Sequence, residues 1–228
     1  MIQRGRGGFS LMELMVVIAV IGALLALGLP AVQRMRQSAR AMECKNNLKQ
    51  MAVALQNHQS EYGSLPKNGV HGWGYATYLL PQVGQSSLFQ TINPGQNTLT
   101  SGASVQIGVT DTVIPTYICP AFLKTPRIST KYGRLSFLGN SGMLNKKKMS
   151  LADVTDGEST TIAFAETVSD YSWARSATSA SSTPQSQHGD GANFAMCDGA
   201  VRWINGNVST TVIQALYTIS SNDVVGEF

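Results

Sequence analysis

The sequence predicts an α+β protein in which a long N-terminal helix is joined to a head built mainly on an antiparallel β-sheet. Three observations support this fold class. An apolar run covers residues 9–29 and is long enough for a membrane-crossing helix. Apolar side chains then recur at three- and four-residue spacing over residues 44–55, as on one face of a helix. Finally, β-branched segments and an Asp-Gly turn signal occur in the C-terminal half.

Length and composition set the function classes that are worth considering. The chain has 228 residues and only 13% charged residues, against roughly 25% in an average soluble domain. Low charge with 22 glycines suits an extracytoplasmic domain better than a cytosolic enzyme. Basic residues cluster at 34–49 and 146–148 without interleaved aromatic residues, so nucleic acid is not an expected partner. The sequence holds no phosphate-binding loop, dinucleotide fingerprint or nucleophile elbow, and we do not expect an enzyme.

The N-terminal run is the first element in chain order. Arg4 and Arg6 precede it, and Glu13 is its one acidic residue. A carboxylate within a membrane segment is costly and usually has a task. Secretory signals have apolar regions of about 7–15 residues, so this run is too long for one. A cleaved secretory signal that ends near residues 26–28, Ala-Leu-Gly, remains the alternative.

Residues 8–14, Gly-Phe-Ser-Leu-Met-Glu-Leu, resemble the prepilin processing site of type IV pilins and type II secretion pseudopilins. The resemblance implies that residues 1–8 form a leader, which prepilin peptidase removes between Gly8 and Phe9. It also implies N-methylation of the new amino terminus on Phe9. Residues 9–29 would then anchor the chain in the inner membrane as a single pass, with the C-terminal head in the periplasm or on the cell surface.

The same resemblance assigns two further residues. Glu13 lies four residues beyond Phe9, where this family places a glutamate that pairs with the amino terminus of a neighbouring subunit during assembly. An ammonium and a carboxylate gain far more from pairing in lipid than in water. Pro30 lies where many pilins carry a helix-kinking proline. The fold implied for the whole chain is therefore pilin-like.

Residues 30–60 are expected to continue the helix as an amphipathic segment. Its predicted buried stripe consists of Cys44, Leu48, either Met51 or Ala52, and Leu55. The breakers at residues 62–66, Tyr-Gly-Ser-Leu-Pro, end the helix. Residues 61–228 then form the head.

Within the head, the patterns favour several short elements. We expect a helical turn at 87–92, loops at 93–112 and 176–187, strands at 134–138 and 161–165, and a helix at 211–220. Asp198-Gly199, between the strand-like segments 193–197 and 200–204, predicts a hairpin with a type I′ turn.

A second resemblance covers nearly the whole chain. Residues 44–50, Cys-Lys-Asn-Asn-Leu-Lys-Gln, and residues 62–66 are similar to the opening of the DUF1559 family, pilin-like proteins of planctomycete-type bacteria. His188, nine intervening residues and Asp198-Gly199 match the C-terminal H-X9-DG motif of that family. Cys119-Pro120, Asp156-Gly157 and Glu166 follow in its expected order. The family has no assigned biochemical activity, so the resemblance implies an architecture and not a task.

The cysteines are Cys44, Cys119 and Cys197. Cys44 and Cys119 both fall in motifs of the family, and an extracytoplasmic head would be oxidising, so the resemblance implies a disulfide between them. Two buried thiols are the alternative. No cysteine belongs to a C-x-x-C pair, which argues against zinc. Cys197 departs from the family pattern and is expected to be buried.

Carboxylates and a histidine offer two weaker candidate sites. His188 with Asp190 and Asp198 is too loosely spaced to specify an acid–base or metal site. We expect instead that Asp198 makes the turn and that His188 bonds to nearby backbone. Acidic residues at 153, 156 and 158 loosely resemble a calcium loop without its spacing. No cofactor is therefore expected, with calcium as a weak alternative.

The resulting hypothesis is a type IV pilin-like or pseudopilin-like subunit of a cell-envelope filament or secretion apparatus. Its expected partners are prepilin peptidase, the membrane, and other pilin-like subunits or copies of itself. The rival hypothesis is a membrane-anchored extracytoplasmic binding protein that uses the pilin leader only for delivery.

Overall fold

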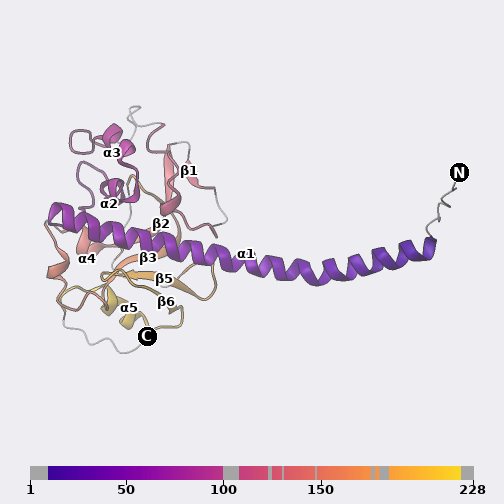
Figure 1. Ribbon diagram of the computed structural model, residues 1–228. Coiled ribbons are helices and arrows are strands. Elements are labelled where there is room, and N and C mark those ends of the chain that lie inside the picture. Colours follow the sequence, from indigo (N-terminus) through magenta and orange to yellow (C-terminus); the bar gives the residue numbers. More distant parts are fainter. Residues whose placement is uncertain are drawn as a thin grey trace. The chain divides into compact units, whose positions relative to one another are not determined.

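The computed structural model describes residues 10–99, 108–122, 125–129, 131–146, 148–175, 178–179 and 185–221. The predicted leader, with Gly8 and Phe9, lies outside the described residues. The chain divides into two compact units, residues 1–39 and residues 40–228, which are described separately below (Figure 1).

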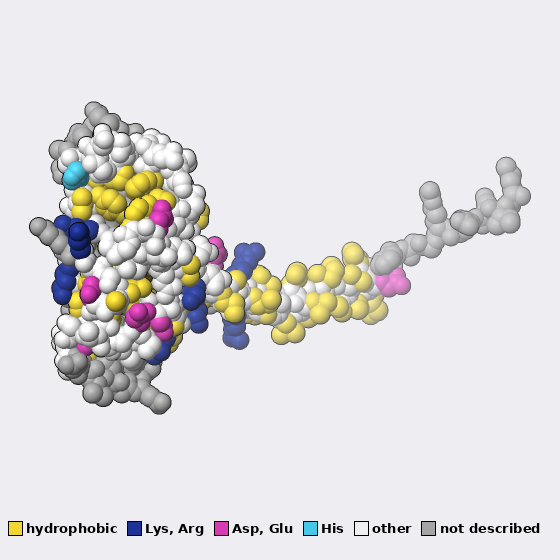
Figure 2. Space-filling view, turned by 60° about the vertical axis from the view of Figure 1, so that its left-hand side comes forward, with side chains coloured by type: hydrophobic (Ala, Val, Ile, Leu, Met, Phe, Trp, Pro, Cys, Tyr) yellow, Lys and Arg dark blue, Asp and Glu magenta, His cyan; other side chains and the backbone are white. Residues whose placement is uncertain are grey.

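From Leu11 onward, the described part of the first unit is a helix with exposed apolar side chains. It is the N-terminal part of α1 (Leu11–Tyr62). Ser10 and Glu13 cap its start, because Ser10 Oγ accepts the Met12 N–H at 3.3 Å and Glu13 Oε2 accepts the Ser10 N–H at 2.8 Å. Exposed Leu, Ile, Val and Met side chains cover this stretch (Figure 2). By length and composition the helix is able to cross a membrane.

Helix α1 runs through Pro30 without interruption and continues into the second unit. There it buries one face, as the stripe predicted. Its buried residues are Cys44, Asn47, Leu48, Met51, Ala52, Ala54, Leu55 and His58. The helix ends at Tyr62 because Gly63 adopts φ +67°, the left-handed conformation that commonly terminates helices.

The second unit is built on a six-stranded sheet with the order β1-β2-β3-β5-β6, and β4 pairs with β2. The strands are β1 (Arg127–Ser129), β2 (Tyr132–Asn140), β3 (Ile162–Ser172), β4 (Thr178–Ser179), β5 (Gly191–Met196) and β6 (Val201–Asn205). All pairings are antiparallel except that of β4 with β2. The antiparallel sheet and the strands predicted at 134–138 and 161–165 are confirmed. The loop predicted over 176–187 was wrong in one respect, since it contains β4.

Short helices and turns connect these strands. They are α2 (Tyr75–Tyr78), η1 (Pro81–Val83), α3 (Ser86–Ile92), η3 (Pro115–Tyr117), α4 (Ser141–Leu144), η4 (Leu151–Asp153) and α5 (Thr210–Tyr217). The helices predicted at 87–92 and 211–220 correspond to α3 and α5. Ser209 Oγ accepts the Val212 N–H at 3.3 Å and so caps α5.

Apolar side chains cover both faces of the sheet. On one face, Leu48 and Leu55 of α1 belong to the same core cluster as Phe164 of β3. On the other face, Ile213 and Leu216 of α5 form a second cluster. The strand residues in that second cluster include Ile162, Ala165, Phe194 and Ile204. Successive residues of a strand point to opposite faces, so Phe164 and Ala165 serve different clusters. An irregularity in the pairing of β3 with β5 between Ile162 and Phe164 interrupts this alternation, so Ile162 serves the same cluster as Ala165.

The hairpin between β5 and β6 is confirmed, but its predicted turn type was wrong. A type I′ turn needs positive φ at both central residues. Here only Gly199 has positive φ, at +82°, and Asp198 does not. The Gly199 N–H donates to the Met196 carbonyl at 3.0 Å, and the Met196 N–H donates to the Ala200 carbonyl at 2.8 Å. The connection is therefore a longer turn that closes on a left-handed glycine, as in a G1 bulge.

Candidate functional site

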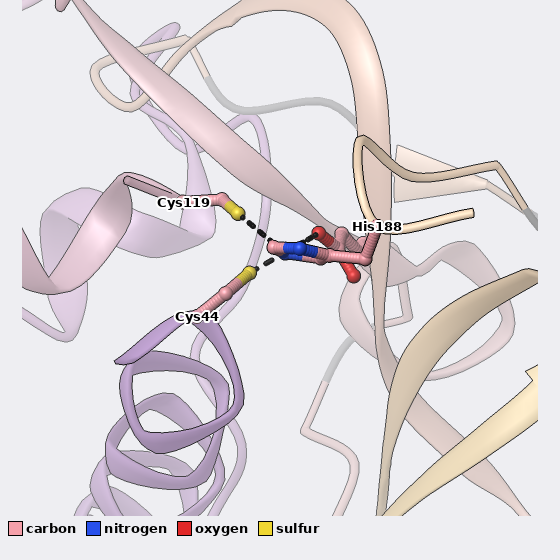
Figure 3. Close-up of side chains that lie close together, drawn as sticks. Cys44, Cys119 and His188 are labelled. Carbon is pink, nitrogen blue, oxygen red and sulfur yellow. Dashed lines mark hydrogen bonds and ion pairs between the residues drawn. The ribbon is translucent and has the colours of Figure 1, made fainter. Parts of the chain in front are cut away.

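Four side chains that bind metals in other proteins meet inside the second unit. They are Cys44 of α1, Cys119 after η3, Glu166 of β3, and His188 in the turn before β5 (Figure 3). One donor atom from each lies within 4.8 Å of every other donor. We call these residues the four-residue cluster. Among the residues that the structure describes, it is the one group of three or more such donors.

The stripe on α1 places the first cysteine. Cys44 is fully buried and begins the buried face of the helix. One turn later, Asn47 Nδ2 donates to the carbonyl of Pro115 at 3.1 Å and to that of Ile118 at 2.8 Å. Residues three apart on a helix share a face. The same face therefore supplies Cys44 and holds the segment that carries Cys119.

Glu166 is buried in β3, with its side chain only 2% exposed. Its two carboxylate oxygens have different partners. Oε2 accepts the backbone N–H of Asn193 at 3.2 Å and its side-chain Nδ2 at 3.0 Å. Oε1 accepts from Cys44 Sγ at 3.1 Å and lies 3.3 Å from His188 Nε2. Asn193 on β5 thus fixes the carboxylate so that Oε1 faces the cluster.

The ring of His188 enters the cluster from the turn that precedes β5. Its Nε2 lies 3.1 Å from Cys119 Sγ, and its side chain is 6% exposed. The His188 backbone N–H donates to Ser186 Oγ at 3.0 Å, and Ser186 pairs with Gly189 in an isolated bridge. The sequence-based expectation that this ring bonds to nearby backbone was therefore wrong.

The cluster favours the charged forms of both His188 and Glu166. The hydrogen bond to Glu166 raises the pKa of His188 to about 9, although burial opposes it. Burial acts to raise the pKa of Glu166, but hydrogen bonds from His188, Cys44 and the Asn193 backbone outweigh it and lower that pKa. His188 and Glu166 therefore form a buried imidazolium–carboxylate pair.

The pKa values of the two cluster thiols are shifted in opposite directions. The contact with Cys119, followed by burial and the Glu166 charge, raises the pKa of Cys44. The contact with Cys44 lowers the pKa of Cys119 despite burial. Cys44 is thus the thiol that keeps its proton, and Cys119 is the better thiolate. Neither cysteine is disulfide-bonded in the structure, and their disulfide stays a prediction.

The second half of the H-X9-DG motif docks on α1, away from the cluster. Asp198 Oδ1 accepts the Ala200 N–H at 2.7 Å, as expected for a turn-forming aspartate. Lys49 Nζ donates to the Gly199 carbonyl at 2.6 Å, and Gln56 Nε2 donates to the Cys197 carbonyl at 3.2 Å. The motif therefore joins a cluster residue to a hairpin tip, and α1 contacts both.

Other candidate residues have local roles. Cys197 is buried, and its Sγ lies 3.5 Å from Met143 Sδ; burial raises its pKa. Asp153 Oδ2 accepts the Ser150 N–H at 2.7 Å, and Asp156 Oδ2 accepts the Ser221 N–H at 2.9 Å. These two carboxylates serve a helical cap and a loop contact, and neither belongs to the cluster. Asp190 is exposed and also lies outside it.

Sequence reasoning missed the roles of Asn47, Glu166 and Asn193. Glu166 was noted only as a motif position, and it lies 122 residues from Cys44. One signal was present: Asn47 follows Cys44 at helical spacing within the segment 44–50. That spacing places both side chains on one face, but it does not reveal what they contact.

Comparisons with known proteins agree with both resemblances. Residues 33–137 match the family described as "Protein of unknown function (DUF1559)". Residues 3–29 match the prokaryotic N-terminal methylation motif. The methylation motif implies processing by prepilin peptidase and association with the membrane. No curated protein and no solved structure matches the chain significantly.

Proposed function

We propose that this chain, in which a DUF1559 region follows a prokaryotic N-terminal methylation motif, is a type IV pilin-like structural subunit of a cell-envelope filament or secretion apparatus. In this proposal prepilin peptidase cuts between Gly8 and Phe9, and Phe9 becomes methylated. Residues 9–29 anchor the chain in the inner membrane and present residues 61–228 outside it.

One observation carries the proposal. Glu13 is the single acidic residue of the apolar run 9–29, which is helical from Leu11 and lies within residues 3–29 that match the methylation motif. The apolar side chains of that helix are exposed and therefore available to lipid or to other helices. A carboxylate at this depth is costly unless it is paired. The amino terminus of a neighbouring processed subunit would supply the opposite charge and fix the register between copies.

The test is Glu13→Ala in the full-length chain, expressed in the native host. Intact-protein mass spectrometry reports the mature N-terminus, and an antibody against the head recovers any filament that contains the chain. We expect Glu13→Ala to be processed normally to methylated Phe9 and to be lost from filaments. The matched control is Glu43→Ala, which removes an exposed carboxylate from the same helix outside the apolar run and should assemble as wild type.

Normal assembly of the Glu13→Ala chain would refute the register role. If instead the wild-type chain is processed and membrane-bound but never recovered in a polymer, the rival function applies, namely a membrane-anchored binding protein. A mature start near residue 29 would contradict both, because it would mean conventional secretion.

A further inference from the structure

We propose that Cys44, Cys119, Glu166 and His188 bind one Zn²⁺ ion in a closed structural site that fastens α1 to the sheet. This inference concerns the second unit alone and does not depend on filament assembly. Nothing in the two family matches assigns a metal to these residues.

The positions of the donors fit a tetrahedral ion. Zinc binds sulfur at about 2.3 Å and nitrogen or oxygen at about 2.0–2.2 Å, so its ligand atoms lie roughly 3.3–3.8 Å apart. In the cluster, Cys44 Sγ lies 3.1 Å from Glu166 Oε1, Cys119 Sγ lies 3.1 Å from His188 Nε2, and Nε2 lies 3.3 Å from Oε1. All other separations are at most 4.8 Å. The first three separations differ from the tetrahedral values by a few tenths of an ångström, and the widest one allowed, 4.8 Å, would have to shorten by about 1 Å to accommodate the ion.

The donor types select zinc among the common cations. Two sulfurs, one imidazole nitrogen and one carboxylate oxygen are a soft and borderline set, which Ca²⁺ and Mg²⁺ do not favour. Cys44, Cys119 and Glu166 are buried, and the His188 side chain is nearly so. Four protein ligands without solvent access are typical of structural zinc sites rather than catalytic ones, which keep a position open.

Groups around the cluster orient the ligands. Asn193 occupies Oε2 of Glu166 and leaves Oε1 to face the ion. Asn47 holds the carbonyls of Pro115 and Ile118, just before Cys119. Such outer contacts are a regular feature of metal sites, since they fix ligand orientation before the ion arrives.

Zinc binding accounts for all four residues, whereas a disulfide accounts for only two. A Cys44–Cys119 disulfide would require an oxidant. It would also leave the imidazole and the carboxylate facing two sulfurs that carry no proton and no charge. When zinc binds, the thiol protons and the Nε2 proton of His188 pass to solvent, and four metal–ligand bonds replace their hydrogen bonds. No electron is transferred, so no oxidant is needed.

The test uses the full-length chain, purified in detergent under reducing conditions without added chelator. Elemental mass spectrometry should find one zinc per chain. Replacement of zinc by Co²⁺ should give a thiolate-to-cobalt charge-transfer band with tetrahedral ligand-field bands. Cys119→Ser should weaken the charge-transfer band and lower the zinc affinity by more than roughly 100-fold, beyond the range seen for outer contacts. Asn193→Ala should keep the band and lose about 10–100-fold in affinity.

The matched control is Cys197→Ser, which removes another buried thiol that lies outside the cluster. It should keep full zinc content and the full cobalt band. The proposal is overturned if the reduced wild-type chain, incubated with excess Zn²⁺ or Co²⁺, shows neither bound metal nor a charge-transfer band. It is equally overturned if peptide mapping of protein from the native host finds Cys44 disulfide-bonded to Cys119.

Discussion

The two halves of α1 have similar backbones and opposite environments. In the first unit, the helix exposes apolar side chains on every side, and Leu24 is 65% exposed. In the second unit, the same helix buries one face against the sheet, and Leu48 is 0% exposed. Helical propensity is therefore not what separates the two halves. The difference lies in what covers each side chain: residues of the same chain bury one face of the second half, whereas the large apolar side chains of the first half are left exposed.

A matched pair of leucines gives the largest expected effect. Leu48→Ala leaves a cavity in the core cluster and should lower the free energy of unfolding of the head by about 2–5 kcal/mol. Leu24→Ala should leave that free energy unchanged. Urea unfolding of the full-length chain in detergent, followed by the fluorescence of the buried Trp73 and Trp173, measures both. If both variants lowered the free energy of unfolding equally, the contrast between a buried and an exposed half of α1 would be wrong.

A matched pair of glycines should give effects of intermediate size. Gly199 has φ +82°, and an added Cβ would lie 3.2–3.4 Å from side-chain atoms of Lys49 and Gln56. Gly199→Ala should therefore cost about 1–2 kcal/mol, because a side chain is strained in the left-handed region. Gly22 lies in the first unit with nothing within 4 Å of an added Cβ, and Gly22→Ala should not change head stability. The same urea titration measures the free energy of unfolding of both variants. An unchanged value for Gly199→Ala would show that the hairpin tip accommodates the added side chain without strain.

The smallest expected effect is on the pH dependence of stability, through His58 of α1. Burial lowers the pKa of His58, although the Ser64 carbonyl and Glu61 oppose this. The unfolded chain binds the proton more readily, with a pKa of about 6.5. Stability from neutral His58 is thus present above that pH and is lost as the pH falls toward the lower folded value. His58→Gln should flatten this part of the stability–pH curve between pH 7.5 and 5.5.

The comparison of the two proteins isolates this residue, since other titrating groups contribute equally to both. His58 Nδ1 lies 3.0 Å from the Ser64 carbonyl, and its ring packs on Tyr62 with centroids 4.6 Å apart. Glutamine keeps a donor for that carbonyl but does not titrate. Identical curves for the two chains would remove His58 as a source of acid sensitivity.

Local patterns predicted those parts of the fold that depend on neighbouring residues. The apolar run, the stripe from Cys44 to Leu55 and the strands around 134–138 and 161–165 all follow from side-chain periodicity. The turn type did not, because both I′ and bulged turns accept Asp-Gly. The bulged turn is identified here by the bond from the Gly199 N–H to the Met196 carbonyl and by the positive φ at Gly199 alone of the two residues.

The four-residue cluster could not be predicted from spacing. Cys44 and Glu166 lie 122 residues apart, and Cys119 and His188 lie 69 apart. Contacts between distant parts of the chain bring their donors together, among them the pairing of β3 with β5, the packing of α1 on the sheet and the hold of Asn47 on the segment before Cys119. The absence of a C-x-x-C pair excluded the common zinc motifs, but it had no bearing on ligands drawn from four separate elements.

The burial pattern along α1 also determines where the chain should be cut for recombinant production. Every buried side chain of the helix lies between Cys44 and His58, and the compact second unit begins at Arg40. A truncation that starts at residue 40 removes the apolar run 9–29 and retains every buried side chain of α1. A truncation that starts at residue 63 would remove all of α1 from the core. The apolar face of the sheet that α1 covers would then be exposed to solvent, and the polypeptide would be prone to aggregation.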